Sequence, residues 1–182
     1  MKTIILDPGH GMSNRRLGVY DPGASSGGVT EAAIVMDWSN ELRDQFKAAG
    51  KKVVRTRVDK SDPAPVGQRA VIARQYGGEI MLSLHCNAAD GSASGCEVFY
   101  RGDTNKPLAT ILSATVAKSL VVRNRGAKTE DESQHGKLAV MGFQPTFLIE
   151  LGFIDHAGDR AKLLDPEMRR KTCAAIVAAV LG

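Results

Sequence analysis

The sequence has few of the features that mark membrane-spanning, disulfide-stabilised or carbohydrate-stacking proteins. Only 5% of its 182 residues are aromatic, with a single tryptophan, and its three cysteines form no CxxC pair. An odd number of cysteines cannot close a disulfide framework, so we expect reduced thiols. No apolar run approaches the roughly 20 residues of a membrane span, which excludes insertion into a membrane.

We also expect no signal peptide in the amino-terminal stretch, because Asp7 and Pro8 interrupt it after a short apolar run. We therefore expect synthesis in a cytoplasm without export by the general secretory route. The net charge is +4 at pH 7, which favours attraction to polyanions only weakly. We interpret the densest basic stretch, residues 123–128, as a solvated loop.

Apolar runs with strand character alternate with stretches of helical period, and no internal repeat or linker interrupts them. This alternation predicts an α/β layer sandwich. The Gly- and Pro-rich segment 7–29 is expected to be functional, since loops of that length are seldom idle in a compact domain. The predicted strands are residues 3–6, 51–56, 79–84, 96–100, 138–141 and 146–149, and the predicted helices are residues 30–49, 66–76, 105–120, 160–164 and 166–180.

Four polar residues stand at informative places relative to these elements. His10 follows the first predicted strand, and His85 and Glu150 each directly follow another. Ligands of open α/β sheets bind at the carboxyl ends of the strands, so we expect these three side chains to share a crevice. Glu31 begins the first predicted helix, after the loop that carries His10, and is placed to reach the same crevice.

Two imidazoles and one carboxylate form a common catalytic zinc set, with a fourth position left for water. On that interpretation His10, Glu31 and His85 bind zinc, and a proton passes from water to Glu150. Spacing alone leaves other interpretations open, namely structural histidines and a glutamate that only complements the helix dipole. Glu150 is harder to explain without a function, because a carboxylate at the end of a buried strand needs a partner.

Three motifs connect these residues with a known family. Leu6-Asp7-Pro8-Gly9-His10-Gly11, followed by Asp21-Pro22-Gly23-Ala24 and Glu31, resembles the opening of the amidase type 3 family of N-acetylmuramoyl-L-alanine amidases. Residues 83–88 (SLHCNA) resemble the second metal motif of that family, and residues 145–154 (PTFLIELGFI) resemble its catalytic segment. The motifs occur in family order and span nearly the whole chain.

This resemblance implies a fold, an activity and a cofactor. The fold would be a three-layer α/β sandwich, with a mixed, mostly parallel sheet of about six strands flanked by helices, and residues 1–182 would form a single catalytic domain. The activity would be hydrolysis of the amide between N-acetylmuramic acid and L-alanine in peptidoglycan. His10, Glu31 and His85 would hold Zn²⁺, and Glu150 would be the catalytic carboxylate.

The chain departs from the family pattern at two places. Residues 12–16 (MSNRR) match no pattern of the family, so the substrate contacts of that loop stay open. Division-associated members carry a long insertion after the second metal motif, with a helix that blocks the zinc. Only residues 89–95 occupy that place here, so we predict an enzyme that needs no activator.

Three further residues are candidates for substrate contact. Asn87 extends the second metal motif, and Arg125 offers a guanidinium to the carboxylates of the stem peptide. His135 precedes the strand next to the catalytic segment and is a candidate for a hydrogen bond to substrate or oxyanion, with an exposed loop histidine as the alternative. We expect Arg69 to form a structural ion pair and Trp38 to lie in the core.

Two other functions stay open. Cys86 is expected to be a buried thiol, because its side chain alternates with that of His85, but a cysteine-dependent peptidoglycan hydrolase would use it as the nucleophile. A non-catalytic cell-wall-binding domain would use the positive charge. The latter leaves Glu31 and Glu150 without purpose, and their charges oppose a nucleic-acid partner.

The expected partner is peptidoglycan, and the expected oligomeric state is a monomer. Such a protein acts on the cell wall, in the periplasm or outside the cell. The small size and the lack of a signal peptide favour a bacteriophage endolysin released through a pore. The catalytic domain of a longer bacterial autolysin fits the sequence equally well.

Overall fold

A computed structural model describes residues 3–182 of the chain. Its central sheet has six strands in the order β6-β1-β7-β10-β8-β9. The first four run parallel, β10 pairs antiparallel with β8, and β8 pairs parallel with the edge strand β9. The predicted mixed, mostly parallel sheet is thus confirmed. Its strands are β1 (Thr3–Pro8), β6 (Lys52–Arg55), β7 (Ile80–Asn87), β8 (Cys96–Tyr100), β9 (Asn124–Thr129) and β10 (Thr146–Phe153).

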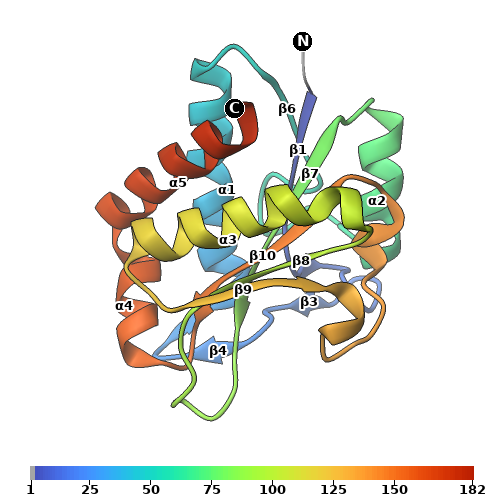
Figure 1. Cartoon of the computed structure of the whole chain (residues 1–182). Helices are drawn as coiled ribbons and strands as arrows, with labels where there is room; N and C mark the ends of the chain where they lie inside the picture. Colours follow the sequence, from blue (N-terminus) through green and yellow to red (C-terminus); the bar gives the residue numbers. More distant parts are fainter. Residues whose placement is uncertain (1–2) are drawn as a thin grey trace.

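Helices cover both faces of the sheet, which confirms the three layers (Figure 1). A large core lies between the sheet and the helices α1, α3 and α5, and a smaller one lies beneath α2 and the 3-10 turn η3. No helix in residues 3–182 is long and apolar enough to cross a membrane. The helices are α1 (Glu31–Ala48), α2 (Val66–Gln75), α3 (Lys106–Leu120), α4 (Ala157–Leu164) and α5 (Pro166–Leu181), and the 3-10 turns are η1 (Asp103–Asn105), η2 (Glu130–Glu132) and η3 (Ala139–Gly142).

The first helix forms where its sequence signals place it. The side chain of Thr30 accepts a hydrogen bond from the backbone of Ala33 at 3.3 Å, which caps the amino end of α1. Gly50, with φ of +71°, follows the carboxyl end. Trp38 lies fully buried on the inner face and donates its indole N–H to the carbonyl of Leu163 at 3.0 Å. The expectation that this tryptophan belongs to the core is confirmed.

Two segments differ from the prediction. Residues 138–141, expected as a strand, lie mostly in η3, where Val140 and Met141 are buried against α2. Their apolar character therefore reflects burial under a helix rather than pairing in the sheet. Residues 123–128, interpreted as a solvated loop, lie mostly in β9, which pairs with β8 at the edge of the sheet. A strand at an edge tolerates charged residues, which is why apolar periodicity missed it.

The segment that follows β1 is ordered by short strand pairs and by a buried ion pair. Strand β2 (Gly11–Met12) pairs with β3 (Tyr20–Asp21), and β4 (Ser25–Ser26) pairs with β5 (Val29–Thr30). Arg69 Nη1 lies 2.6 Å from Asp7 Oδ1, and neither side chain is more than 1% exposed. Burial opposes ionisation of Asp7, but Arg69 and hydrogen bonds from two hydroxyl groups hold its pKa below the usual value. The structural ion pair expected for Arg69 is confirmed.

Removing this arginine should be far more harmful than removing an exposed one from the same helix. Arg69→Met leaves the Asp7 carboxylate buried without its counter-charge, so we expect the free energy of unfolding to fall by about 3–5 kcal/mol. Arg74→Met, which removes one exposed hydrogen bond to Gly142, should lower it by about 1 kcal/mol or less. Urea denaturation followed by circular dichroism measures both. Equal small losses would contradict the structural role given to Arg69.

Candidate metal centre

The turn after β1 carries His10 and has an unusual backbone. His10 adopts φ of +58°, and its carbonyl accepts a hydrogen bond from Arg69 Nη2 at 2.7 Å. The adjoining Gly9 packs against the ring of His85, and a Cβ atom at that glycine would lie 2.3 Å from the ring. Only glycine therefore lets the turn approach β7 closely enough for the two imidazoles to meet, with ring centroids 5.1 Å apart.

Glu31 reaches the same place from the amino end of α1. Its Oε2 accepts a hydrogen bond from the backbone of Ala24 at 3.0 Å, and its Oε1 accepts one from the backbone of Cys86 at 3.0 Å. A Cβ atom at Gly23, whose φ is +66°, would lie 2.6 Å from Glu31 Oε2. The loop before α1 thus fits closely around this carboxylate and fixes its direction.

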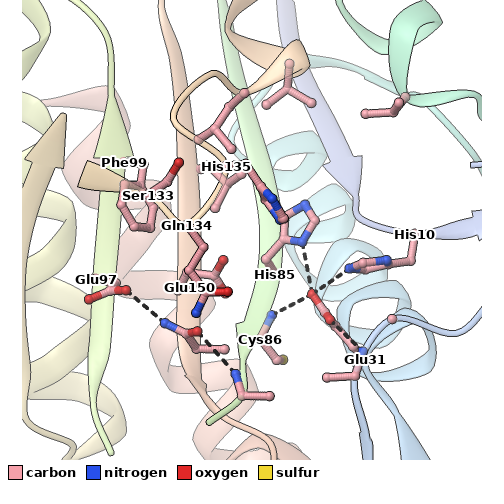
Figure 2. A pocket seen from close by; sticks show the side chains of 18 of the residues that line it. His10, Glu31, His85, Cys86, Glu97, Phe99, Ser133, Gln134, His135 and Glu150 are labelled. Carbon is pink, nitrogen blue, oxygen red and sulfur yellow. Dashed lines mark hydrogen bonds and ion pairs between the residues drawn. The ribbon is translucent and has the colours of Figure 1, made fainter. Parts of the chain in front are cut away.

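The donor atoms of these three residues converge. Glu31 Oε1 lies 3.0 Å from His10 Nε2 and 2.9 Å from His85 Nδ1, and one ligand atom from each residue lies within 4.8 Å of the others. Figure 2 shows both rings directed at the carboxylate. The three side chains are 5–19% exposed. Sequence reasoning placed them in one crevice, and the structure brings them together.

The charges around this cluster favour a cation. Burial opposes protonation of His10, but hydrogen bonds and charges from Glu31 and Asp21 raise its pKa. Burial likewise opposes ionisation of Glu31, while hydrogen bonds to both histidines lower its pKa strongly. His10 Nδ1 also lies 3.2 Å from Asp21 Oδ2, a second carboxylate held by Asn14. Converging donors, with a carboxylate behind one histidine, fit a metal ion.

Glu150 lies beside the cluster, in the middle of the sheet. Strands β7 and β10 run longer than predicted, so His85 and Glu150 lie within them and are register partners. On the other side of β10, Glu150 is the register partner of Glu97 in the antiparallel strand β8 (Figure 2). Its Oε2 is shielded from solvent and has no hydrogen-bond partner among the described residues. Burial, then the charges of Glu31 and Glu97, raise the pKa of Glu150 well above the usual value.

The three candidate substrate residues all line one pocket of about 870 Å³, together with the metal-ligand cluster and Glu150. Asn87 Nδ2 and Arg125 Nε each donate to Glu97, both at 2.8 Å. His135 lies in the exposed loop that borders the pocket (Figure 2). Their closeness to the cluster agrees with the prediction, while contact with a substrate stays a prediction.

Sequence reasoning missed Glu97 and the position of Asp21. A glutamate in the apolar strand 96–100 is the same signal that singled out Glu150, a carboxylate that needs a partner when buried. Asp21 belongs to a family-like motif, but its hydrogen bond to His10 could not be read from spacing. Cys86, expected as a buried thiol, is 4% exposed and packs in the larger core. Burial, Glu31 and Glu150 raise its pKa well above the usual value.

Fold and site together define an α/β protein with a candidate metal centre, beside a carboxylate of the inner strand β10 that has one oxygen without a hydrogen-bond partner among the described residues. Comparison with known sequences identifies the family. The model of the N-acetylmuramoyl-L-alanine amidase family (Amidase_3) matches residues 4–181, and the chain belongs to this family.

Individual relatives support this assignment. An uncharacterized cell wall amidase of Bacillus anthracis is 31% identical over 199 residues, covering 99% of this chain and 35% of that protein. The "Probable cell wall amidase LytH" of Staphylococcus aureus is 32% identical over 180 residues, covering 97% of this chain and 56% of that protein. The chain thus spans between a third and somewhat over half of these two relatives. The solved structure of an N-acetylmuramoyl-L-alanine amidase from Clostridium difficile 630 superposes with a TM-score of 0.86 at 26% identity, covering 99% of this chain and 95% of that one.

Replacing Glu150 should make the metal-free protein more stable at high pH. An unfolded glutamate ionises near pH 4.3, whereas burial keeps Glu150 protonated to higher pH in the folded state. Wild-type stability therefore falls as pH rises from that value through the raised pKa. Glu150→Gln has no carboxyl group that must stay protonated, so it does not lose stability in this way. Its free energy of unfolding should equal that of wild type at pH 4 and exceed it by about 1 kcal/mol or more at pH 8.

Urea titrations of chelator-treated protein at the two pH values give the comparison, because other titrating groups are shared and cancel. Glu167→Gln is the control. That carboxylate lies exposed on α5 and Arg170 lowers its pKa, so its removal should not raise the stability at pH 8. A difference between wild type and Glu150→Gln that stays constant with pH would show that folding does not raise the pKa of Glu150.

Proposed function

We propose that this chain is a zinc-dependent amidase that hydrolyses the bond between N-acetylmuramic acid and L-alanine in peptidoglycan. His10, Glu31 and His85 would hold the zinc, and Glu150 would be the catalytic carboxylate. The observation that carries the proposal is the convergence of three donor atoms within 4.8 Å, in a pocket with a carboxylate oxygen that has no hydrogen-bond partner in residues 3–182. Family membership supplies the substrate class.

The donor set fits zinc better than it fits the oxygen-preferring cations Ca²⁺ and Mg²⁺. Two imidazole nitrogens and one carboxylate match catalytic zinc sites, whereas Ca²⁺ and Mg²⁺ prefer oxygen ligands. Zinc bound there would supply Lewis-acid chemistry, polarising the scissile carbonyl and acidifying water to a pKa of about 7. Glu31 is held by two backbone N–H groups and His10 by Asp21, so little rearrangement of these side chains is needed.

Glu150 is placed to move protons during hydrolysis. A carboxylate with a raised pKa accepts a proton from the attacking water and then donates it to the leaving amide nitrogen. Glu150 lies next to His85 in register, so its carboxyl group borders the ligand cluster, and its Oε2 makes no competing hydrogen bond within the described residues. Burial raises its pKa, which favours the acidic role.

The alternative of a cysteine hydrolase is disfavoured. The thiolate is the nucleophilic form of cysteine, and the environment of Cys86 raises its pKa well above the usual value. The side chain is 4% exposed and packs in the larger hydrophobic core. A non-catalytic wall-binding domain gives no reason to bury the carboxylates of Glu31 and Glu150.

We propose that the chain works as a single catalytic domain and as a monomer, without an activating partner, on peptidoglycan of the cell wall. Residues 88–95, which join β7 to β8, contain no helix, and three of them line the pocket. Whether such a domain belongs to an endolysin or to an autolysin does not alter the proposed chemistry.

Digestion of purified peptidoglycan by the protein alone tests the proposal. Zinc-loaded wild type should release free stem peptides and leave glycan strands intact, as mass spectrometry would detect. Chelator-treated protein should be inactive and regain activity with zinc. Glu150→Gln should bind zinc normally yet lose about a hundredfold or more in activity, because general acid–base catalysis contributes about 10²–10⁴-fold.

Cys86→Ser is the matched control and should keep its zinc dependence and most of its activity. Cleavage within the glycan or within the peptide would replace the proposed bond by another. A Cys86→Ser variant that is inactive but folded would favour the cysteine hydrolase, and a zinc-loaded wild type without products would contradict the amidase.

Asp21 should strengthen zinc binding without touching the metal. It accepts the hydrogen bond of His10 Nδ1 and so fixes the ring that presents Nε2 to the cluster. Loss of such a support typically weakens metal affinity ten- to a hundredfold, and we expect this loss for Asp21→Asn. Competition with a chromophoric zinc chelator measures the affinity. Asp37→Asn, an exposed change on α1, should leave it unchanged, and equal affinities for all three proteins would exclude the role.

A further inference from the structure

A second group of charges lies in the same pocket, away from the metal-ligand cluster. Glu97 of β8 is 4% exposed and accepts hydrogen bonds from Arg125 Nε at 2.8 Å and Lys128 Nζ at 2.6 Å. Asn87 Nδ2 donates to its other oxygen at 2.8 Å. One buried carboxylate thus faces two cations, and the group keeps a net positive charge.

The side chain of Arg125 is held in place, but not all of its N–H donors are used. Its Nε bonds to Glu97, and its guanidinium lies 5.0 Å from the ring centroid of Phe153. The two terminal nitrogens form no hydrogen bond with any described residue, and the side chain is 28% exposed where it lines the pocket. Lys128 is similarly placed, over the ring of Phe99 at 6.0 Å. A pre-oriented guanidinium with unused donors is suited to bind a carboxylate.

We propose that Arg125, assisted by Lys128, binds a free carboxylate of the stem peptide and so makes the enzyme prefer stem peptides with a free carboxylate over those with a carboxamide there. Glu97 is a positioning residue in this subsite, because it orients both cations. The inference rests on the proposed amidase function and adds to it the class of stem peptide that is cleaved.

The spacing of the sheet sets which part of the peptide reaches this subsite. Glu150 lies on β10, and Arg125 lies two strands away on β9. Neighbouring strands lie about 4.8 Å apart, so the separation across the sheet is roughly 10 Å. An extended peptide advances about 3.3–3.6 Å per residue, and the arginine side chain shortens the gap further. The bound carboxylate therefore belongs to the first two or three residues after the scissile amide.

The surrounding charges favour a single carboxylate over a polyanion. Asp21 and Glu132 line the same pocket and would repel a chain of phosphates. A lone carboxylate can bind Arg125 while the rest of a peptide passes the acidic residues. A carboxamide would direct N–H groups or an uncharged oxygen at the guanidinium and lose charge-assisted hydrogen bonds. We expect this loss to weaken binding about ten- to a hundredfold.

Two muramoyl dipeptides that differ only at this group test the inference. One is muramoyl-L-alanyl-D-glutamate with a free α-carboxylate, and the other is the matching D-isoglutamine carboxamide. Zinc-loaded wild type should cleave the carboxylate form with a kcat/KM about tenfold or more higher. Arg125→Met should lower kcat/KM for the carboxylate form by about ten- to a hundredfold and change the carboxamide form less than threefold.

Arg123→Met is the matched control, since this exposed arginine precedes β9 and does not line the pocket, and it should keep the wild-type preference. Binding is measured separately by calorimetry in the Glu150→Gln background, where Arg125→Met should weaken only the carboxylate form. Equal losses on both ligands, or a wild type without preference, would overturn the subsite.

The two measurements keep this inference distinct from the proposed function. Arg125-dependent binding of the carboxylate form without any hydrolysis by wild type would support the subsite and contradict the amidase. Hydrolysis of both forms at the same rate, unchanged by Arg125→Met, would support the amidase and overturn the subsite.

Discussion

The buried guanidinium groups of Arg57 and Arg69 bind the backbone of the turn that follows β1. Arg57 donates to the carbonyls of Pro8 and Gly9 at 2.9 and 2.8 Å, and Arg69 donates to the carbonyl of His10 at 2.7 Å. These contacts hold His10 at a positive φ that a non-glycine residue seldom adopts. Burial, together with the neighbouring Arg69, lowers the pKa of Arg57 to about 10, so Arg57 stays charged at neutral pH. The position of His10, the first candidate metal ligand, therefore depends on these hydrogen bonds.

Arg57 also connects the turn to α1. Arg57 Nη2 also donates to the carbonyl of Ala32 at 3.0 Å, next to Glu31. The turn with His10 and the helix with Glu31 are thus fastened to one side chain, while His85 comes from the neighbouring strand β7. Because hydrogen bonds fix the turn, and α1 and β7 carry the other two residues, the protein can hold the three candidate ligands together before a cation arrives. The gathered carboxylates of Asp21 and Glu31 give a cation a strong electrostatic advantage there.

Several features could be predicted from the sequence because they depend on local order along the chain. His10, His85 and Glu150 follow apolar runs, and parallel strands bring their carboxyl ends to one edge, so a shared crevice follows from topology alone. The distances within it do not, because they depend on how closely Gly9 lets the turn approach β7. Strand β9 was missed for a different reason. Its residues are polar, and only pairing with β8 makes them a strand.

The antiparallel strand β8 explains why Glu97 was missed. The sequence prediction considered polar residues that follow apolar runs, and His85 and Glu150 do follow such runs, although both lie within the longer strands β7 and β10. Strand β8 runs against β10, and β9 runs with β8, so their first residues lie at the edge where the parallel strands end. Glu97 and Arg125 each occupy the second position of their strand. Strands of both directions thus contribute residues to the pocket. The proposed chemistry lies on the parallel strands β7 and β10, and the proposed recognition lies on β8 and β9, which run in the opposite direction.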